Sequence, residues 1–431
     1  MLPRESVAPT DPTPCVPGET DVAVIGGGVI GLCVAYELVQ MGREVVVIDK
    51  GPVARGSAVG NAGFIVPSHV IPMAAPGVMP GVIKGILRRT GPVTARPSLD
   101  PDYLRWILRF ALNCTRDAAH RGAVTLAALG FLSAELAVEL IAKEGIECGY
   151  RPEGLLHVYG DARALEAAKH EAAEMQRYGV EVEMYDRATI REVEPSLNDE
   201  VIGGFLCVDD GGLDPAGFLA GLAEVIAGRG VGLASHAELL GFRTSGCKVV
   251  ELTTSRGTLV ADQVVLAAGA WTKRISALLG ESIPVQPGKG YSMTVDRPRT
   301  GPRLNLLIGD RWVAVNPMGD KMRMSGWLEL GRLDTRPSLR RLAHVEANVR
   351  ARVNLDPDLT VRERWAGLRP VTPDGIPIVG PARRWENVTY ATGHGKVGLS
   401  LGPVTGRLVA QMLCGVPTDL DVGHLSPARF W

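Results

Sequence analysis

The chain has 431 residues, more than one hydrophobic core usually serves, which predicts two or three domains. Its 46% hydrophobic and 22% charged residues exclude extended disorder, and the balance of 46 Lys and Arg against 47 Asp and Glu excludes a basic field for nucleic acid. Seven scattered cysteines without a C-x-x-C pair argue against a metal site or disulfide scaffold and favour reduced thiols in the cytoplasm.

Residues 1–19 are rich in Pro and polar residues and lack the apolar stretch of a signal peptide, so we predict a flexible leader. The run from 21 to 49 then reads as an apolar strand, a glycine turn, a helix and a second strand. This order is a βαβ unit.

The glycine turn carries Gly26, Gly28 and Gly31, which fit the G-x-G-x-x-G pattern of dinucleotide sites. Asp49 ends the second strand, where a carboxylate can bind ribose hydroxyl groups. The helix start beside the turn favours phosphate binding. We therefore predict dinucleotide contacts, with NAD and FAD both open at this point, from Gly26, Gly28, Val29, Ile30, Gly31, Asp49 and Lys50.

The segment from 81 to 113 alternates basic residues, among them Lys84, Arg88, Arg105 and Arg109, with apolar ones. Such a stretch can lie on an anionic membrane surface. The favoured alternative is a solvated helix whose apolar side faces the core.

Helical patterns follow at 123–144, 163–178, 215–226 and 403–413, and strand-like runs at 248–254, 259–266, 290–295, 312–315 and 322–327. Nucleotide-type signals near both ends and the middle predict an α/β protein with a discontinuous Rossmann-like domain. The expected second domain is α+β, with a large antiparallel sheet. We assign 20–90, 200–276 and 365–431 to the first domain, and 91–199 and 277–364 to the second, substrate-binding or cap domain.

Four stretches resemble the amine-oxidising FAD family of D-amino acid dehydrogenases, D-amino acid oxidases, glycine oxidase and sarcosine oxidases. They are the fingerprint with Asp49, the stretch 60–77 containing NAG and AAPG, the strand 264–271, and 365–406. The second stretch is most similar to bacterial D-amino acid and D-hydroxyproline dehydrogenases. Since no Cys lies between 365 and 380, where sarcosine oxidases carry their flavin-linking Cys, the resemblance implies non-covalent FAD.

The resemblance implies further FAD contacts along three stretches. The loop 55–63 has small residues that permit close approach, the strand at 264–271 also fits a plain core strand, and the turn 393–398 would face the flavin. The implied residues are Ser57, Gly60, Asn61, Ala62, Gly63, Ala268, Gly269, Trp271, Gly393, Gly395, Lys396, Val397 and Gly398.

Arg369 matches the arginine that anchors the substrate carboxylate in glycine-oxidase-like relatives, and an ion pair with Asp374 or a nearby Glu is the alternative. Lys396 would stabilise negative charge on the reduced flavin, although glycine oxidases have Arg there. Tyr291 and Trp312 are pocket candidates with core packing as an equal alternative, and His394 is a pocket residue whose role as a base is not favoured.

These features predict oxidative deamination of D-amino acids to 2-oxo acids and ammonia, with hydride passing from the substrate Cα to flavin N5. Electrons would go to a quinone or other acceptor, and the preference for the D enantiomer follows only from the resemblance. The rival predictions are an oxygen-using oxidase of glycine, sarcosine or a cyclic amine such as D-proline or D-hydroxyproline, a nicotinamide enzyme, and a flavin-binding partner subunit. Oligomerisation and peripheral membrane contact stay open.

Overall fold

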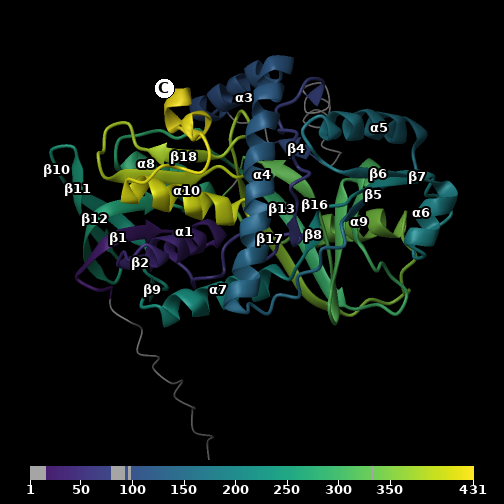
Figure 1. Ribbon diagram of the computed structural model, residues 1–431, viewed down its shortest axis with the longest axis horizontal. Helices are drawn as coiled ribbons and strands as arrows, with labels where there is room; N and C mark the ends of the chain where they lie inside the picture. Colours follow the sequence, from purple (N-terminus) through teal and green to yellow (C-terminus); the bar gives the residue numbers. More distant parts are fainter. Residues whose placement is uncertain (1–15, 79–92, 96–98, 332) are drawn as a thin grey trace, which may run out of the picture.

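The computed structural model describes residues 16–78, 93–95, 99–331 and 333–431. These residues form two large sheets, which lie at opposite ends of the molecule in Figure 1. The long helix α4 (Arg116–Glu144) runs across the junction between them (Figure 1).

The first sheet is built around parallel strands. Ile25 at the end of β1 is in register with Ile48 of β2 and with Leu266 of β12. The loops that follow these three strands therefore meet at one edge of the sheet, where open α/β sheets bind ligands. The eight strands are β1 (Glu19–Ile25), β2 (Val45–Ile48), β9 (Gly232–Ala234), β10 (Leu239–Ser245), β11 (Lys248–Thr254), β12 (Gly257–Leu266), β18 (Ile378–Pro381) and β19 (Val388–Thr392).

One core joins this sheet to its helices. Val22 and Val24 of β1 point to the helical side, whereas Ala23 and Ile25 pack against the antiparallel extension on the other. Asp214 caps α7 by accepting the N–H of Ala216. The helices of this domain are α1 (Val29–Gln40), α7 (Pro215–Gly228), α8 (Thr272–Leu278) and α10 (Gly402–Cys414).

The second sheet is mostly antiparallel and is flanked by α3 (Pro101–Asn113), α5 (Ala162–Gln176), α6 (Arg187–Val193) and α9 (Leu339–Arg350). Strands β3 (Phe64–Ile65) and β8 (Gly211–Gly212) pair antiparallel in a separate two-stranded sheet. The nine strands are β4 (Val93–Ala95), β5 (Leu155–Tyr159), β6 (Val182–Asp186), β7 (Gly203–Cys207), β13 (Gln286–Asp296), β14 (Asn305–Ile308), β15 (Val313–Met318), β16 (Lys321–Leu330) and β17 (Val361–Val371).

The predicted fold class is confirmed, and four boundaries need correction. Residues 16–19 belong to the fold and not to the predicted leader, because Val16 is buried and Glu19 begins β1; residues 1–15 lie outside the described residues. β7 and all of β17 belong to the second sheet, because their backbones pair with β5 and β13. Helix α4 packs its buried face into the first core rather than the second domain.

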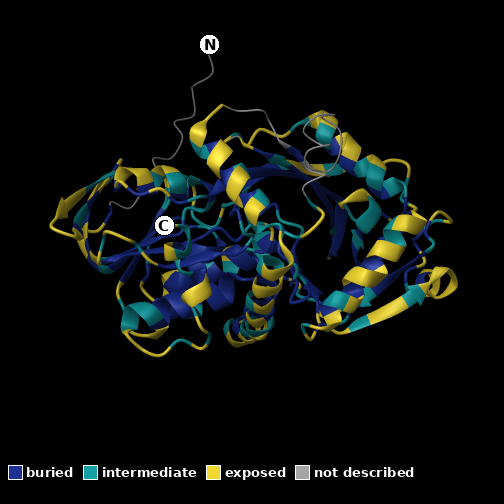
Figure 2. Ribbon diagram, turned by 90° about the horizontal axis from the view of Figure 1, so that it is seen from above, coloured by how far each residue is buried: buried dark blue, intermediate teal, exposed yellow. Residues whose placement is uncertain are grey.

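Helix α4 is long and apolar enough to cross a membrane by length and composition. Its residues Leu126, Leu129 and Leu140 are buried in the first core, and Ser133 Oγ donates to the carbonyl of Ser400 at 2.6 Å. Figure 2 shows buried residues concentrated in the interior and exposed residues on the peripheral helices and strands. These contacts are those of a core helix.

Candidate active site

The glycine turn between β1 and α1 is shaped by two kinds of constraint. Gly26 has a φ of 115°, and a Cβ there would lie 2.5 Å from the carbonyl oxygen of Ala267. A Cβ on Gly31 would overlap the carbonyl oxygen of Gly26. A Cβ on Gly28, in contrast, would meet nothing within 4 Å. The fold itself requires the first and third glycines, whereas the second leaves space for a ligand.

Helix α1 starts at this space with free donors. Its N-cap Gly28 has no side chain, and no acidic residue lies in the first turn. Within the described chain, the first-turn N–H groups of Val29, Ile30 and Gly31 have no acceptor. Such a helix start binds phosphate groups.

Asp49 and Lys50 lie at the end of β2 beside the turn. Asp49 accepts the N–H of Gly27 and of Gly51, each at 2.8 Å, which fixes its carboxylate with lone pairs to spare. Lys50 Nζ lies 3.9 Å from the ring centroid of Trp271. Burial lowers the pKa of Lys50, partly offset by the Asp49 charge.

These groups line a cavity of about 940 Å³ that extends from the first sheet to the second. Seventeen of the predicted site residues line it, so segments distant in sequence converge on one cavity. They are Gly26, Gly28, Val29, Ile30, Asp49, Lys50, Ser57, Gly60, Asn61, Ala268, Gly269, Trp271, Tyr291, Arg369, His394, Gly395 and Gly398.

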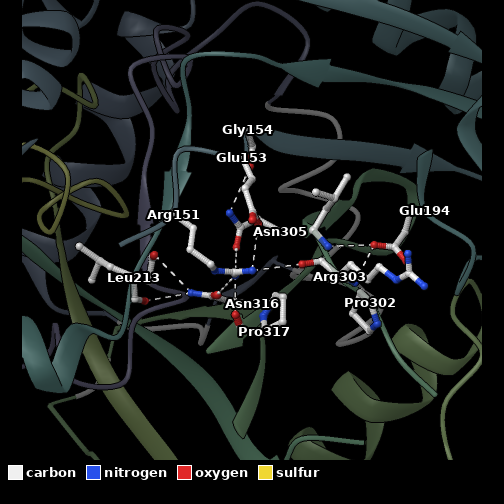
Figure 3. A network of polar contacts seen from close by, with 12 residues as sticks. Arg151, Glu153, Gly154, Glu194, Leu213, Pro302, Arg303, Asn305, Asn316 and Pro317 are labelled. Carbon is white, nitrogen blue, oxygen red and sulfur yellow. Dashed lines mark hydrogen bonds and ion pairs between the residues drawn. The ribbon is translucent and has the colours of Figure 1, made fainter. Parts of the chain in front are cut away.

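The loop 59–63 is held from outside the cavity by the second sheet. Arg323 Nη1 donates to the carbonyls of Val59 at 2.6 Å and Asn61 at 3.0 Å. Asn316 Nδ2 donates to the carbonyls of Ala62 at 2.8 Å and Leu213 at 3.0 Å (Figure 3). The loop carbonyls are thus turned away from the cavity.

Behind this loop, Arg151 fixes Asn316 in turn. Arg151 Nη2 donates to the Oδ1 atoms of Asn305 at 3.3 Å and Asn316 at 3.5 Å (Figure 3). With its Oδ1 engaged, Asn316 directs its amide N–H groups at the loop. On the cavity side, a Cβ on Gly60 would overlap the ring of Trp365.

Arg369 lies at the other end of the cavity, near the end of β17. Its Nη1 donates to the carbonyl of Trp327 at 2.9 Å. In the described part of the chain no carboxylate pairs with it, because Asp374 pairs instead with Arg429 at 2.7 Å. Burial lowers the pKa of Arg369 to about 10, so the group stays cationic at neutral pH. The ion-pair alternative with Asp374 is excluded, and the cation is available to an anion.

The side chain of Lys396 has solvent-accessible surface. It is nevertheless surrounded by protein atoms, and this desolvation lowers its pKa. It is not among the lining residues of the cavity. Its charge lowers the pKa of His69 and of His157, after the larger effect of their burial. Lys396 therefore contributes positive potential behind the Arg369 end.

His394 is a buried, neutral side chain. Burial lowers its pKa to about 3. Thr405 Oγ1 donates its proton to the carbonyl of Leu401 at 2.7 Å, so it accepts from His394 Nε2 at 2.9 Å. This anchored ring fits a structural turn residue better than a base.

The other predicted site residues lie elsewhere. Trp312 is 62% exposed and lies outside the lining, because it occupies a left-handed turn position with φ 57° before β15. Gly31 is packed under the turn, as described. Ala62, Gly63, Gly393 and Val397 support the lining loops without being part of it.

Sequence reasoning missed part of the lining. The unpredicted residues include Glu238 and Leu239 beside β2, Arg274 on α8, and Trp365 on β17. Trp365 stands four residues before Arg369 on one strand, so the alternation of β17 could have placed it on the same side. Glu238 and Arg274 carry no local signal. In the described residues, no group of three or more metal-ligating side chains occurs.

The fold and the cavity define an α/β dinucleotide-binding protein with two large sheets. The family model described as DAO, FAD dependent oxidoreductase, matches residues 21–412, and the chain belongs to this family.

Its relatives include D-amino acid dehydrogenases from Granulibacter bethesdensis and Rhodopseudomonas palustris. The first is 32% identical, covering 95% of this chain and 99% of the relative, and the second is 34% identical, covering 95% and 97%. Among solved structures, glycine oxidase from Geobacillus kaustophilus is similar with a TM-score of 0.77 and 24% identity, over 96% of this chain and 99% of that one.

FAD fits the residues of the cavity. The open space at Gly28 and the free amides of α1 suit a pyrophosphate, and Asp49 beside them suits a ribose. The family is FAD dependent, which settles the choice between FAD and NAD that the glycine pattern alone left open.

Proposed function

We propose that the chain is a D-amino acid dehydrogenase, converting D-amino acids to 2-oxo acids and ammonia. The observation that carries this proposal is Arg369, a cation in the cavity wall that pairs with no carboxylate of the described residues. A guanidinium so placed suits a substrate carboxylate. The D-amino acid dehydrogenases among the relatives support the substrate class.

FAD would be held non-covalently, and in keeping with this no cysteine is among the described residues that line the cavity. The α1 amides would bind its pyrophosphate and Asp49 its ribose, with the loop 57–61 along its length. When bound, FAD supplies the acceptor for a hydride from the substrate Cα.

The protein's own residues would orient the substrate and control its protonation. Arg369 holds the carboxylate, which aims the Cα–H bond into the cavity. Once cofactor and substrate have displaced solvent from the cavity, the ammonium form is disfavoured, so the amine lone pair becomes available without a dedicated base. Neutral His394 adds no charge, and Lys396 supplies positive potential near Arg369, including for negative charge on a reduced cofactor.

The test is an assay of purified protein with D- and L-amino acids, glycine, sarcosine, D-proline and D-hydroxyproline, with a quinone analogue or oxygen as acceptor. We expect ammonia and 2-oxo acid from D-amino acids with the quinone analogue, and little hydrogen peroxide. Full-rate turnover with oxygen, on glycine or a cyclic amine, would instead establish an oxidase.

We further propose that the enzyme works in the cytoplasm and delivers electrons at an anionic membrane surface through α3. Leu104, Leu108 and Leu112 are 50%, 60% and 67% exposed at a spacing of four residues, which makes an apolar ridge along the helix. Arg105 and Arg109 form the neighbouring stripe. The preceding basic residues 81–92 of this predicted segment lie outside the described residues.

Beside α3, a cleft of about 460 Å³ collects five cationic side chains, those of Arg105, Arg109, Lys273, Arg383 and Arg384. Its two carboxylates are engaged. Asp102 pairs with Arg105 and Lys273, and Glu281 accepts from the Arg384 N–H and the Tyr390 hydroxyl. The resulting positive cleft beside an apolar ridge matches anionic lipid headgroups over acyl chains.

Sedimentation with vesicles tests this surface. Binding should occur with phosphatidylglycerol vesicles and fall strongly when Leu104, Leu108 and Leu112 become Gln, or when Arg383 and Arg384 become Glu. Leu339→Gln, at an equally exposed leucine on α9, is the control. Unchanged binding by both multiple variants would reject α3 as the contact.

A further inference from the structure

The carboxylate arginine lies across a gap in the neighbouring strand. Gly290 of β13 stands beside β17, and a Cβ there would overlap Arg369 Nη1, with Cζ at 2.6 Å and Nη2 at 2.7 Å. The guanidinium therefore occupies the space that any side chain at residue 290 would fill. Because Gly290 does not have a positive φ, this glycine is required for space and not for backbone conformation.

On the other side of Gly290, strand β16 carries an irregularity. Lys289 pairs with Glu329 and Tyr291 with Gly326, so Trp327 and Leu328 together stand opposite Gly290 alone. This two-against-one pairing is a β-bulge. Trp327 has a φ of 70°, a strained conformation for a bulky side chain.

The Trp327 ring is fixed by three contacts that can hold the strained backbone. Its Nε1 donates to Thr94 Oγ1 at 3.3 Å, the Arg341 guanidinium carbon lies 4.1 Å from the ring centroid, and His344 meets the ring edge-on at 5.1 Å. The bulge presents the carbonyl of Trp327 to Arg369 Nη1 at 2.9 Å. Strained backbone conformations cluster at active sites, where they can hold a functional group in the required orientation.

We propose that the Trp327 bulge and the gap at Gly290 position Arg369 so that its Nε–Nη2 edge is the one presented to the substrate carboxylate. Nη1 of Arg369 already donates to the carbonyl of Trp327, whereas its Nε and Nη2 have no acceptor within the described residues. Two parallel N–H groups on one edge of a guanidinium match a carboxylate with two bonds. Gly290 and Trp327 are thus positioning residues, and this inference rests on the proposed role of Arg369.

Gly290→Ala tests the gap. Propionate, a carboxylate without an oxidisable amine, is titrated into the FAD-loaded protein and followed by the flavin absorbance. We expect its dissociation constant, and the KM for D-alanine, to rise about tenfold or more, since displacement by about 1 Å is costly. As a control we use Gly221→Ala on α7, which adds a methyl group against Ile146. The FAD affinity and melting temperature of Gly290→Ala should stay near those of this control.

Two substitutions that differ by a single methyl group test the bulge. Trp327→Ala and Trp327→Gly both remove the ring, but glycine adopts a φ of 70° without strain. If the backbone conformation positions Arg369, propionate should bind Trp327→Gly several-fold more tightly than Trp327→Ala. Equal losses would mean that only the packing of the ring matters, and would overturn the role of the bulge.

Arg369→Ala separates this inference from the proposed function. If Arg369→Ala abolishes propionate binding and Gly290→Ala does not weaken it, the positioning device is rejected while the anchor stands. If Arg369→Ala leaves propionate binding intact, the anchor itself is rejected. In the Arg369→Ala background, Gly290→Ala should cause no further loss, as expected for two changes acting through one group.

Discussion

At the end of the cavity beside the first sheet, the groups that suit a ligand are the backbone amides of α1 and the carboxylate of Asp49, whereas beside the second sheet the group is a single side chain, that of Arg369. At the first end, free amides of α1 surround the open space at Gly28, and Asp49 is fixed by backbone N–H groups. At the second end, Arg369 lies between Gly290 and the carbonyl of Trp327. The end beside the first sheet is therefore fitted to the cofactor, whereas substitution of a few side chains beside the second sheet can change which substrate binds.

Gly28→Val should have the largest effect, because it removes the first end. The residue has φ −82° and ψ −177°, which valine adopts easily, and its Cβ meets no protein atom. The variant should therefore fold but lose FAD, and with it all turnover. Flavin absorbance and circular dichroism of the purified variant measure this, and full FAD occupancy would refute the glycine turn as the pyrophosphate site.

Arg369→Ala should remove the second end alone. We expect kcat/KM for D-amino acids to fall roughly 10²- to 10³-fold, as for the loss of a charged hydrogen-bonding partner. FAD content and spectrum should be unchanged. Steady-state kinetics with a dye acceptor check this, and kinetics equal to the wild type would show that the two ends are not divided as described.

Arg323→Met tests the contact by which the second sheet holds the loop 59–63 beside the cofactor end of the cavity. It leaves the carbonyls of Val59 and Asn61 without their buried donor, which should cost about 3 kcal/mol of unfolding free energy and weaken FAD binding. Denaturant unfolding with and without added FAD measures both effects. Arg362→Met, at an exposed arginine on the same sheet, is the matched control. Equal stability of the two variants would contradict the role of Arg323 in holding the loop 59–63.

Asp210 gives the smallest effect, through pH. It accepts Ser68 Oγ at 2.6 Å, and burial raises its pKa from 3.8 to about 7. Near neutral pH the folded state holds a proton that the unfolded state releases. The stability that Asp210 contributes is therefore complete below about pH 4 and is lost as pH rises through 7. Between about pH 5 and pH 7 the loss should be roughly 2 kcal/mol. Asp210→Asn should flatten this dependence, and an unchanged slope would exclude Asp210 as its source.

The first end was predictable from sequence because its residues are contiguous. Gly26 to Gly31 and Asp49 form one βαβ unit, so local pattern and site coincide. The distinction between structural Gly26 and Gly31 and ligand-facing Gly28 needed the packing of Ala267 against the turn.

The second end was predictable only in part. Arg369 was identified by resemblance, but its neighbours Gly290 and Trp327 come from two other strands, and their pairing depends on a register shift. Trp312, suggested for the pocket by the resemblance, lies outside the lining because its own left-handed backbone before β15 leaves it at the surface, a local conformation that the resemblance does not reveal. The packing of α4 in the first core likewise depends on contacts distant in sequence.

The most direct measurement is the visible spectrum of the purified protein under anaerobic conditions, before and after addition of single D- and L-amino acids, followed by air. We predict a flavin spectrum that D-amino acids bleach and L-amino acids do not, with slow recovery in air. A flavin spectrum that no D-amino acid bleaches would leave the FAD site in place and contradict the proposed chemistry.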